Sequence, residues 1–174
     1  MGGGDSKYRC LLRIVTWLIA RGNKRIELMG RYVIGEVNVD GYERYAAVKG
    51  VEDGKKLIVH FLEYDEYIES SVESKKRRIG DILEGEIAIG LVSVDKKVNA
   101  ELMHRQLIPI SSHIEAVVQV YRALDDYSVL AFSSLAEDKI LVEFEHRVNY
   151  QNGDMVYLEG SLEFNVIINE SIMP

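Results

Sequence analysis

The stretch YDEYIESSVESKKRR, which occupies residues 64–78, holds the densest group of side chains that could bind a ligand. Its tyrosines can stack on nucleobases, and the four consecutive basic residues at its end can contact phosphates. The same stretch contains three glutamates that would compete with phosphate, so a solvated loop paired within itself is the alternative interpretation. Together with two earlier tyrosines, the ligand-binding face that we expect comprises Tyr42, Tyr45, Tyr64, Tyr67, Lys75, Lys76, Arg77 and Arg78.

Histidine titrates near neutral pH without a large pKa shift, and the chain has four: His60, His104, His113 and His146. Of these, His104 and His113 lack the spacing of a metal-binding pair on one helix. The sequence contains no nucleophile elbow, phosphate loop, dinucleotide fingerprint or zinc-protease motif. We therefore predict no catalytic residue, no metal ligand and no cofactor, and we favour a binding module over an enzyme.

Two aspartates, Asp81 and Asp154, each follow a glycine immediately before a strand-like run. A pair of carboxylates invites an interpretation as general acid and base. Glycine followed by aspartate is, however, typical of a turn in which the carboxylate binds nearby backbone N–H groups. We interpret both aspartates as turn residues.

The first six residues, MGGGDS, fit the pattern for N-myristoylation at Gly2, and Cys10 is a candidate for a second acylation. An unmodified glycine-rich start is the alternative. The apolar run CLLRIVTWLIA is too short to span a bilayer and is interrupted by Arg13. We therefore expect a membrane partner only if Gly2 is myristoylated.

Composition places the chain among soluble proteins of one domain or two small ones, with 174 residues, 47% of them hydrophobic and 28% charged. The single cysteine, Cys10, cannot form an internal disulfide, which favours the reducing cytoplasm. Residues 1–31 carry seven basic and two acidic side chains, a net charge of +5, so the remainder carries −12 of the total −7. An acidic body disfavours non-specific binding of nucleic acid.

The elements that must position these side chains are mainly strands. In RYVIGEVNVDG, alternation places Val33, Val37 and Val39 on one side, and an Asp-Gly turn signal follows. Before it, DSKYRCLLRIVTWLIARGN has helical spacing of Leu11, Val15, Leu18 and Ile19, although its β-branched residues leave a strand as the alternative.

Four strand-like blocks occur twice in the same order, which predicts an internal duplication. The matching pairs are 32–39 with 113–120, 44–48 with 126–130, 55–61 with 138–144, and the phrase GDILEGEIAIGLV with GDMVYLEGSLEFNVI. Between the copies, VNAELMHRQL has a helical pattern that ends at Pro109. The segments that we expect are a basic amphipathic helix over 1–29, a first β repeat over 30–97 with the insertion 64–78, a linker helix over 98–112, and a second β repeat over 113–172.

One four-stranded copy leaves two edges and an apolar face exposed, so we expect both copies to combine in one antiparallel eight-stranded barrel or sandwich. A helical insertion after a third strand resembles the OB-fold, whose members bind single-stranded nucleic acid. The phrase VNYQNGDMVYLEGSLEFNVI resembles the last strands of hot-dog thioesterases and dehydratases. We predict a non-catalytic module that binds a protein partner; OB-like nucleic-acid binding, a hot-dog-like hydrolase and a homodimer through strand edges are the alternatives.

Overall fold

The computed structural model describes residues 30–63 and 77–166, which form a mainly β structure with no helix in these two ranges. Nine strands belong to one sheet, one more than the eight that we predicted. The strands are β1 (Gly30–Asp40), β2 (Glu43–Gly50), β3 (Lys56–Leu62), β4 (Ile82–Lys97), β5 (Met103–Arg105), β6 (His113–Asp125), β7 (Ser128–Phe132), β8 (Ile140–Phe144) and β9 (Met155–Val166).

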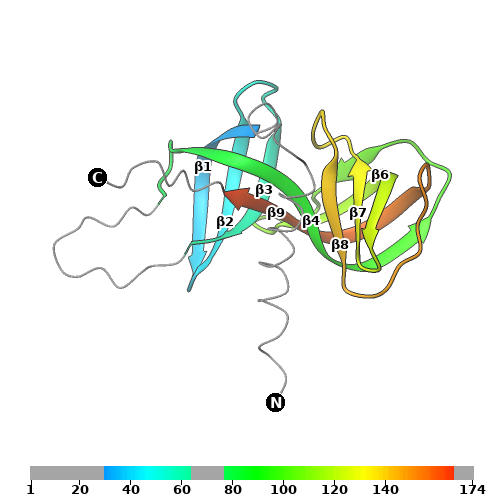
Figure 1. The fold of residues 1–174 in the computed structure, drawn as a ribbon. Coiled ribbons are helices and arrows are strands. Elements are labelled where there is room, and N and C mark those ends of the chain that lie inside the picture. Colours follow the sequence, from blue (N-terminus) through cyan, green and yellow to red (C-terminus); the bar gives the residue numbers. More distant parts are fainter. Residues whose placement is uncertain (1–29, 64–76, 167–174) are drawn as a thin grey trace, which may run out of the picture.

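The sheet closes on itself twice and so forms two rings (Figure 1). In the first ring the order of pairing is β1-β2-β3-β9-β4 and back to β1. In the second ring it is β6-β7-β8-β4-β9 and back to β6. All these pairings are antiparallel except β3 with β9 and β4 with β8, which are parallel.

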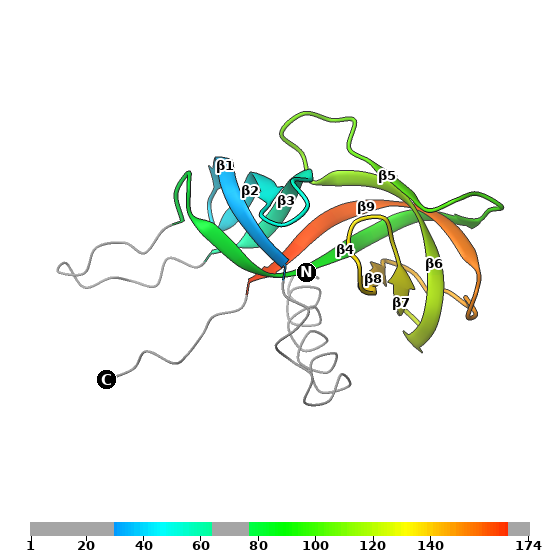
Figure 2. The same ribbon diagram turned by 90° about the horizontal axis from the view of Figure 1, so that it is seen from above.

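Strands β4 and β9 are long, side by side, and shared by both rings (Figure 2). The first part of β4 pairs with β1, and its later part pairs with β8 of the second ring. In the same manner β9 pairs first with β6 and then, near its end, with β3 of the first ring. Each half of the chain therefore completes the ring of the other half, and neither ring is closed without both halves.

Two glycines allow the paired strands β4 and β9 to pack closely against each other. A Cβ atom on Gly85 would lie 2.2 Å from the carbonyl oxygen of Asn165, and one on Gly160 would lie 2.7 Å from that of Gly90. Both values are far below ordinary van der Waals contact, so only glycine fits without a backbone shift. These glycines hold corresponding places in the two phrases that the sequence repeats.

The interior of both rings is one hydrophobic core made of the inward residues of the alternating strands. Ile34, Val59 and Leu83 are buried in the first ring, and Val129 and Val142 in the second. The shared strands connect the two parts, because Ile89 on β4 and Leu162 on β9 belong to the same core. One continuous core makes the described part of the chain one packing unit.

The two glycine-aspartate pairs are turns, as predicted. Asp81 Oδ2 accepts a hydrogen bond of 2.7 Å from the backbone N–H of Arg78, and Asp154 Oδ2 accepts one of 2.8 Å from Gln151. Lys97 adds an ion pair to Asp154 at 2.7 Å. Both carboxylates therefore stabilise their own turns by accepting hydrogen bonds from the backbone.

The prediction of a linker helix in 98–112 is wrong. Met103–Arg105 form strand β5, whose backbone pairs with β6, and the side chain of Gln106 bonds to both backbone groups of Ile58. Leu102 and Leu107, which would belong to a buried helical face, are 40% and 62% exposed. Strand pairing satisfies the backbone here, whereas a helix would have no apolar surface to cover. The predicted helices in 1–29 and in the insertion lie outside the described residues.

Candidate functional site on the outer face of the sheet

A single transverse line of side chains crosses eight strands on the face of the sheet opposite the core. Each residue is the direct partner of the next across a strand pair, and directly paired residues point to the same face. We call this line the outer-face row; in order it contains Asn38, Tyr45, His60, Glu163, Ala88, Leu141, Leu130 and Arg122. The row is continuous only because β4 and β9 join the two rings.

The half of the outer-face row in the first ring is polar. His60 Nδ1 lies 2.7 Å from Glu163 Oε2, and the ring of Tyr45 lies 5.0 Å from the imidazole, centroid to centroid. The Tyr45 hydroxyl donates to Glu43 Oε2 at 3.1 Å. His60 Nε2 and Glu163 Oε1 are buried, and neither has a hydrogen-bond partner among the described residues. Unsatisfied atoms on two directly paired residues indicate a place where a further polar group would be stabilised.

The charge state of His60 follows from its neighbours. Burial lowers the pKa of His60, but the hydrogen bond and charge of Glu163, with the charge of Glu43, outweigh it, so the pKa lies above the ordinary 6.5. Burial, followed by the hydrogen bond and charge of Glu43, raises the pKa of Tyr45. The polar half thus combines an imidazole whose pKa is raised by neighbouring carboxylates with a phenol whose pKa is also raised.

The half of the outer-face row in the second ring is apolar. Ala88, Leu141 and Leu130 are 3%, 4% and 6% exposed and form a small cluster separate from the core, with Leu124 packed against it. Their chain neighbours Ile89, Val142 and Val129 point into the core, so these three lie on the opposite side of the sheet. The outer face therefore has an apolar half next to a polar half.

Acidic side chains predominate around the outer-face row. The basic side chains on the outward positions of β1 to β3 are Arg31, which pairs with Glu84 on β4, Lys49 and Lys56. The outward positions that border the row on β1, β2, β4 and β8 bear Glu36, Asp40, Glu43, Glu86 and Glu143. The electrostatic character of this face attracts cations and repels phosphates.

At the open end of the first ring, a buried ion-pair network links β2, β3 and the chain that enters β4. Glu63 accepts from Arg44 Nε at 3.1 Å and from Arg77 Nη1 at 3.0 Å, and the side chains of Arg44 and Glu63 are 2% and 10% exposed. Arg44 Nη1 also donates to the carbonyl oxygen of Gly41 at 2.7 Å. The third nitrogen, Nη2, is buried and has no hydrogen-bond partner in 30–63 or 77–166. The network fixes this end of the ring.

The structure divides the eight residues of the predicted ligand-binding face. Tyr42 is exposed at the β1–β2 turn, whereas Arg77 is held by Glu63 and the backbone N–H of Arg78 is held by Asp81. Tyr42, Tyr45 and Arg77 lie at or next to the same end of the first ring, because Glu63 also donates its N–H to the carbonyl of Tyr42. Gly2, Tyr64, Tyr67, Lys75 and Lys76 lie outside the described residues.

Sequence reasoning missed the roles of Arg44, Glu63 and Glu163, and it assigned His60 no site. One signal was available in the alternation of β2. Arg44 lies two residues before the buried Ala46 and four before Val48, so the alternation places its charged side chain on the inward face. Glu163 and His60 are more than a hundred residues apart in sequence and meet only through the parallel pairing of β3 with β9. No local pattern could have paired them.

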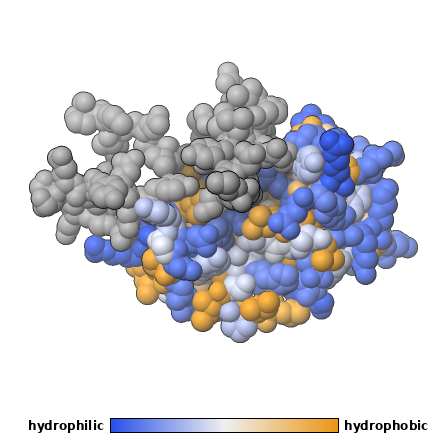
Figure 3. Space-filling model, turned by 90° about the horizontal axis from the view of Figure 1, so that it is seen from below, coloured by the Kyte–Doolittle hydropathy of each residue, from blue (hydrophilic) through white to orange (hydrophobic). Residues whose placement is uncertain are grey.

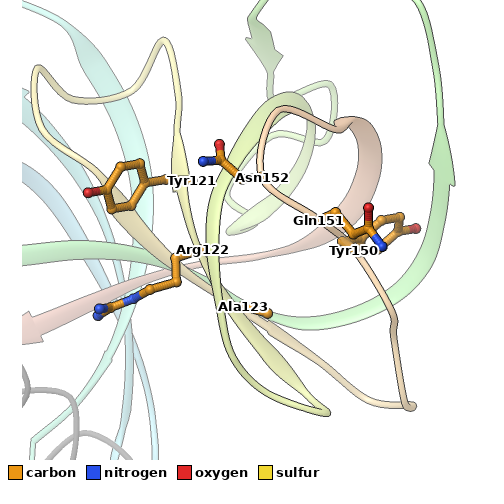
Figure 4. A pocket seen from close by; sticks show the side chains of 6 residues that line it. All are labelled: Tyr121, Arg122, Ala123, Tyr150, Gln151 and Asn152. Atoms are coloured by element: carbon orange, nitrogen blue, oxygen red, sulfur yellow. The ribbon is translucent and has the colours of Figure 1, made fainter.

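A shallow hollow of about 450 Å³ lies beyond the Arg122 end of the outer-face row (Figure 4). Tyr121 and Arg122 on β6 point away from Tyr150 and Gln151, so the lining side chains do not converge. The Tyr150 hydroxyl instead donates to Asp95. A catalytic pocket needs convergent polar groups, and this hollow does not supply them.

The described part of the face drawn in Figure 3 is mostly hydrophilic, with apolar side chains in scattered patches. Among the described residues, no group of three or more His, Cys, Asp or Glu side chains is placed to hold a metal ion. Those residues also contain no helix long and apolar enough to cross a membrane.

Comparison of the chain with protein-family models, curated proteins and solved structures finds no match.

Proposed function

We propose that this protein is a non-catalytic binding module that takes a basic, amphipathic polypeptide segment on the outer-face row. The observation that carries the proposal is the pair of buried atoms without partners, His60 Nε2 and Glu163 Oε1, at the middle of the row. A lysine or arginine of the partner would satisfy the carboxylate oxygen in a charge-assisted hydrogen bond. Apolar side chains of the same segment would pack beside the buried Leu130, on the exposed ring of Phe132 two residues further along β7.

The order of strands supports a related alternative, an OB-like module for single-stranded nucleic acid. Each ring follows the Greek-key order of a five-stranded OB barrel: three consecutive strands, a parallel partner for the third, and a fourth strand that returns to the first. The insertion 64–78 has the place of the helix in that fold. Strands β2 and β3 are where such barrels bind oligonucleotides, but here this face bears Glu43 and Glu163, which disfavour phosphate.

The hot-dog hydrolase receives no support from the fold. A hot-dog sheet wraps around a long helix, whereas both rings here are filled by side chains of their own strands. A thioesterase also needs a carboxylate or histidine at a substrate cavity, and the hollow beside Tyr121 has no converging group.

We propose further that 30–97 and 113–172 are two copies of one unit, and that the protein works in the cytoplasm, as its single cysteine suggests.

The test is an NMR titration of the ¹⁵N-labelled full chain with three probes: an amphipathic peptide of leucine and lysine, its counterpart with glutamate for lysine, and an oligothymidylate. We expect the lysine peptide alone to shift the amides of Tyr45, His60, Glu163, Leu130 and Leu141, with an affinity that falls as salt rises. Shifts at these amides with the oligothymidylate and not the lysine peptide would replace this proposal by the OB-like alternative.

A charge-neutral variant makes the test specific for the site. Glu163→Gln should weaken the lysine peptide about tenfold, since it removes one charge-assisted hydrogen bond. Glu101→Gln, at an exposed position on the connection between β4 and β5, is the matched control and should leave the affinity unchanged. Equal affinities of the two variants would contradict the assignment of the site to Glu163.

A further inference from the structure

The ion-pair network of Arg44, Glu63 and Arg77 at the open end of the first ring contains more positive than negative charge. Two guanidinium groups share one carboxylate: Glu63 Oε2 accepts from Arg44 Nε at 3.1 Å, and Glu63 Oε1 accepts from Arg77 Nη1 at 3.0 Å. The side chains of Arg44 and Glu63 are 2% and 10% exposed, so water screens little of this charge. One positive charge therefore has no counter-charge within the network.

Arg44 also has hydrogen-bond donors that the network does not use. A guanidinium group has five N–H donors and no acceptor. Nε donates to Glu63, and Nη1 donates to the backbone carbonyl oxygens of Gly41 and Glu43 at 2.7 and 3.1 Å. Nη2 is buried and makes no hydrogen bond within the described ranges. A buried donor of a charged group is costly without an acceptor, so an acceptor of negative charge would be stabilised there.

The second ring shows that ring closure does not need a guanidinium at this place. Val48 on β2 and Ala131 on β7 hold the same place in the two rings, since each pairs with the residue that exchanges backbone hydrogen bonds with the glycine-aspartate turn of its ring. Arg44 lies four residues before Val48, and Tyr127 lies four residues before Ala131. The second ring thus has a tyrosine where the first has a buried arginine. Because a buried ion pair is weak evidence of a gain in stability, the fold alone does not account for Arg44.

Arg77 provides the side of the network that faces solvent. Its side chain is 29% exposed, whereas that of Arg44 is 2% exposed. Both guanidinium groups bond to oxygens of one carboxylate, so they lie close enough for one small anion to contact both. A phosphate group offers several acceptor oxygens in a small volume, and the planar guanidinium matches its geometry with paired N–H bonds.

We propose that the ion-pair network is a binding site for a phosphate group, in which Arg44 Nη2 and Arg77 donate to the phosphate oxygens and Glu63 holds both guanidinium groups in place. The site does not rest on the proposed function of the outer-face row, because Arg44 has an inward position on β2 and its neighbour Tyr45 an outward one. Free phosphate and the phosphoryl group of a small metabolite present the same chemistry to the two arginines.

The experiment is thermal unfolding of the full chain in potassium phosphate and in potassium chloride at the same pH and ionic strength. A ligand that binds only the native state raises Tm, and phosphate at ten times its Kd should raise Tm by about 4 °C relative to chloride. In a ¹⁵N NMR titration, phosphate should shift the side-chain Nε–H signals of Arg44 and Arg77 and leave the amides of His60 and Leu141 unchanged.

A parallel titration with glycerol 3-phosphate separates the two sources of the phosphate group. Binding of glycerol 3-phosphate as tightly as free phosphate would support the site as one for the phosphoryl group of a metabolite. Binding of free phosphate alone would support a site for the inorganic ion.

Two variants with the same change of charge make the test specific. Arg77→Gln removes a charged donor to the anion and should weaken phosphate about tenfold. Arg78→Gln is the matched control, because this side chain is exposed and the contact of Arg78 with Asp81 is made by its backbone N–H. Equal Tm values in phosphate and chloride, or equal phosphate affinities of the two variants, would overturn the proposal. Phosphate shifts at Lys49 and Lys56 without a shift at Arg44 would overturn it as well.

Discussion

The tight packing of β4 against β9 at Gly85 gives the sharpest test of the fold. In Gly85→Ala the new Cβ would lie 2.2 Å from the carbonyl oxygen of Asn165 and 2.8 Å from Cε1 of Phe164. The oxygen belongs to a paired strand and cannot rotate away, so one of the two strands must move. Overpacking of a core costs about 1–3 kcal/mol, and a fixed backbone obstacle places this variant near the upper end, at about 3 kcal/mol.

A milder variant and a control come from two other glycines. In Gly160→Ala the Cβ would lie 2.7 Å from the carbonyl oxygen of Gly90 and 3.0 Å from a methyl group of Val92, which can shift, so we expect a loss of about 2 kcal/mol. In Gly35→Ala the nearest atom is the carbonyl oxygen of Ala47 at 3.6 Å, an ordinary contact. That control should change the free energy of unfolding by no more than about 0.5 kcal/mol.

The assay is urea unfolding of the purified proteins followed by circular dichroism of the strand signal, with thermal unfolding as a second measurement. A loss of about 3 kcal/mol is a large part of the 5–15 kcal/mol typical of a folded domain. In a chain of this size it lowers Tm by roughly 6–12 °C. If Gly85→Ala were as stable as Gly35→Ala, the close packing of β4 against β9 at Gly85 would be refuted.

The further predictions concern polar groups. Glu163→Gln should lower the pKa of His60, because the largest of the contributions that raise it is removed while burial remains; NMR titration of the imidazole measures this, and an unchanged pKa would contradict the pairing. In the wild type the protonated imidazole stabilises the fold fully below pH 6.5, and this contribution is lost as pH rises through the raised pKa of His60, a dependence that Glu163→Gln should abolish. Glu63→Gln should cost about 3 kcal/mol in urea unfolding, since Arg44 remains buried and charged; a loss under about 0.5 kcal/mol would refute the network. Gln106→Ala should lower the free energy of unfolding by about 1–2 kcal/mol, because the backbone N–H and C=O of Ile58 on β3 lose their partner. Hydrogen exchange at the Ile58 amide should accelerate, and unchanged exchange would contradict the contact.

The local β signals were read correctly from the sequence, yet one face was assigned wrongly. Alternation grouped Val33 with Val37 and Val39, whereas Ile34 is the residue that is buried in the core. A β-bulge between Ile34 and Glu36 shifts the register by one residue, and every side chain after it changes face. An extra residue in one strand is invisible to a strict period of two.

The two rings place their first strands in a different correspondence from the one that the sequence match predicts. The sequence match of 32–39 with 113–120 aligns Ile34 with Glu115. The hydrogen bonds of the two glycine-aspartate turns give Ile34 and Val120 the same place, since each exchanges backbone bonds with its own turn at 2.7–2.9 Å. Apolar alternation looks alike at every second residue, so it does not fix register by itself.

The sequence alone determined the strand content, the turns at Asp81 and Asp154, and the division between a basic N-terminus and an acidic body, because these depend on neighbouring residues and on composition. Only the tertiary structure decided that β4 and β9 are shared by the two rings. This sharing brings His60 to Glu163 and lets Ala88 continue the same line toward Leu141. Pairings between strands a hundred residues apart depend on loop closure and packing of the whole core, which no local pattern encodes.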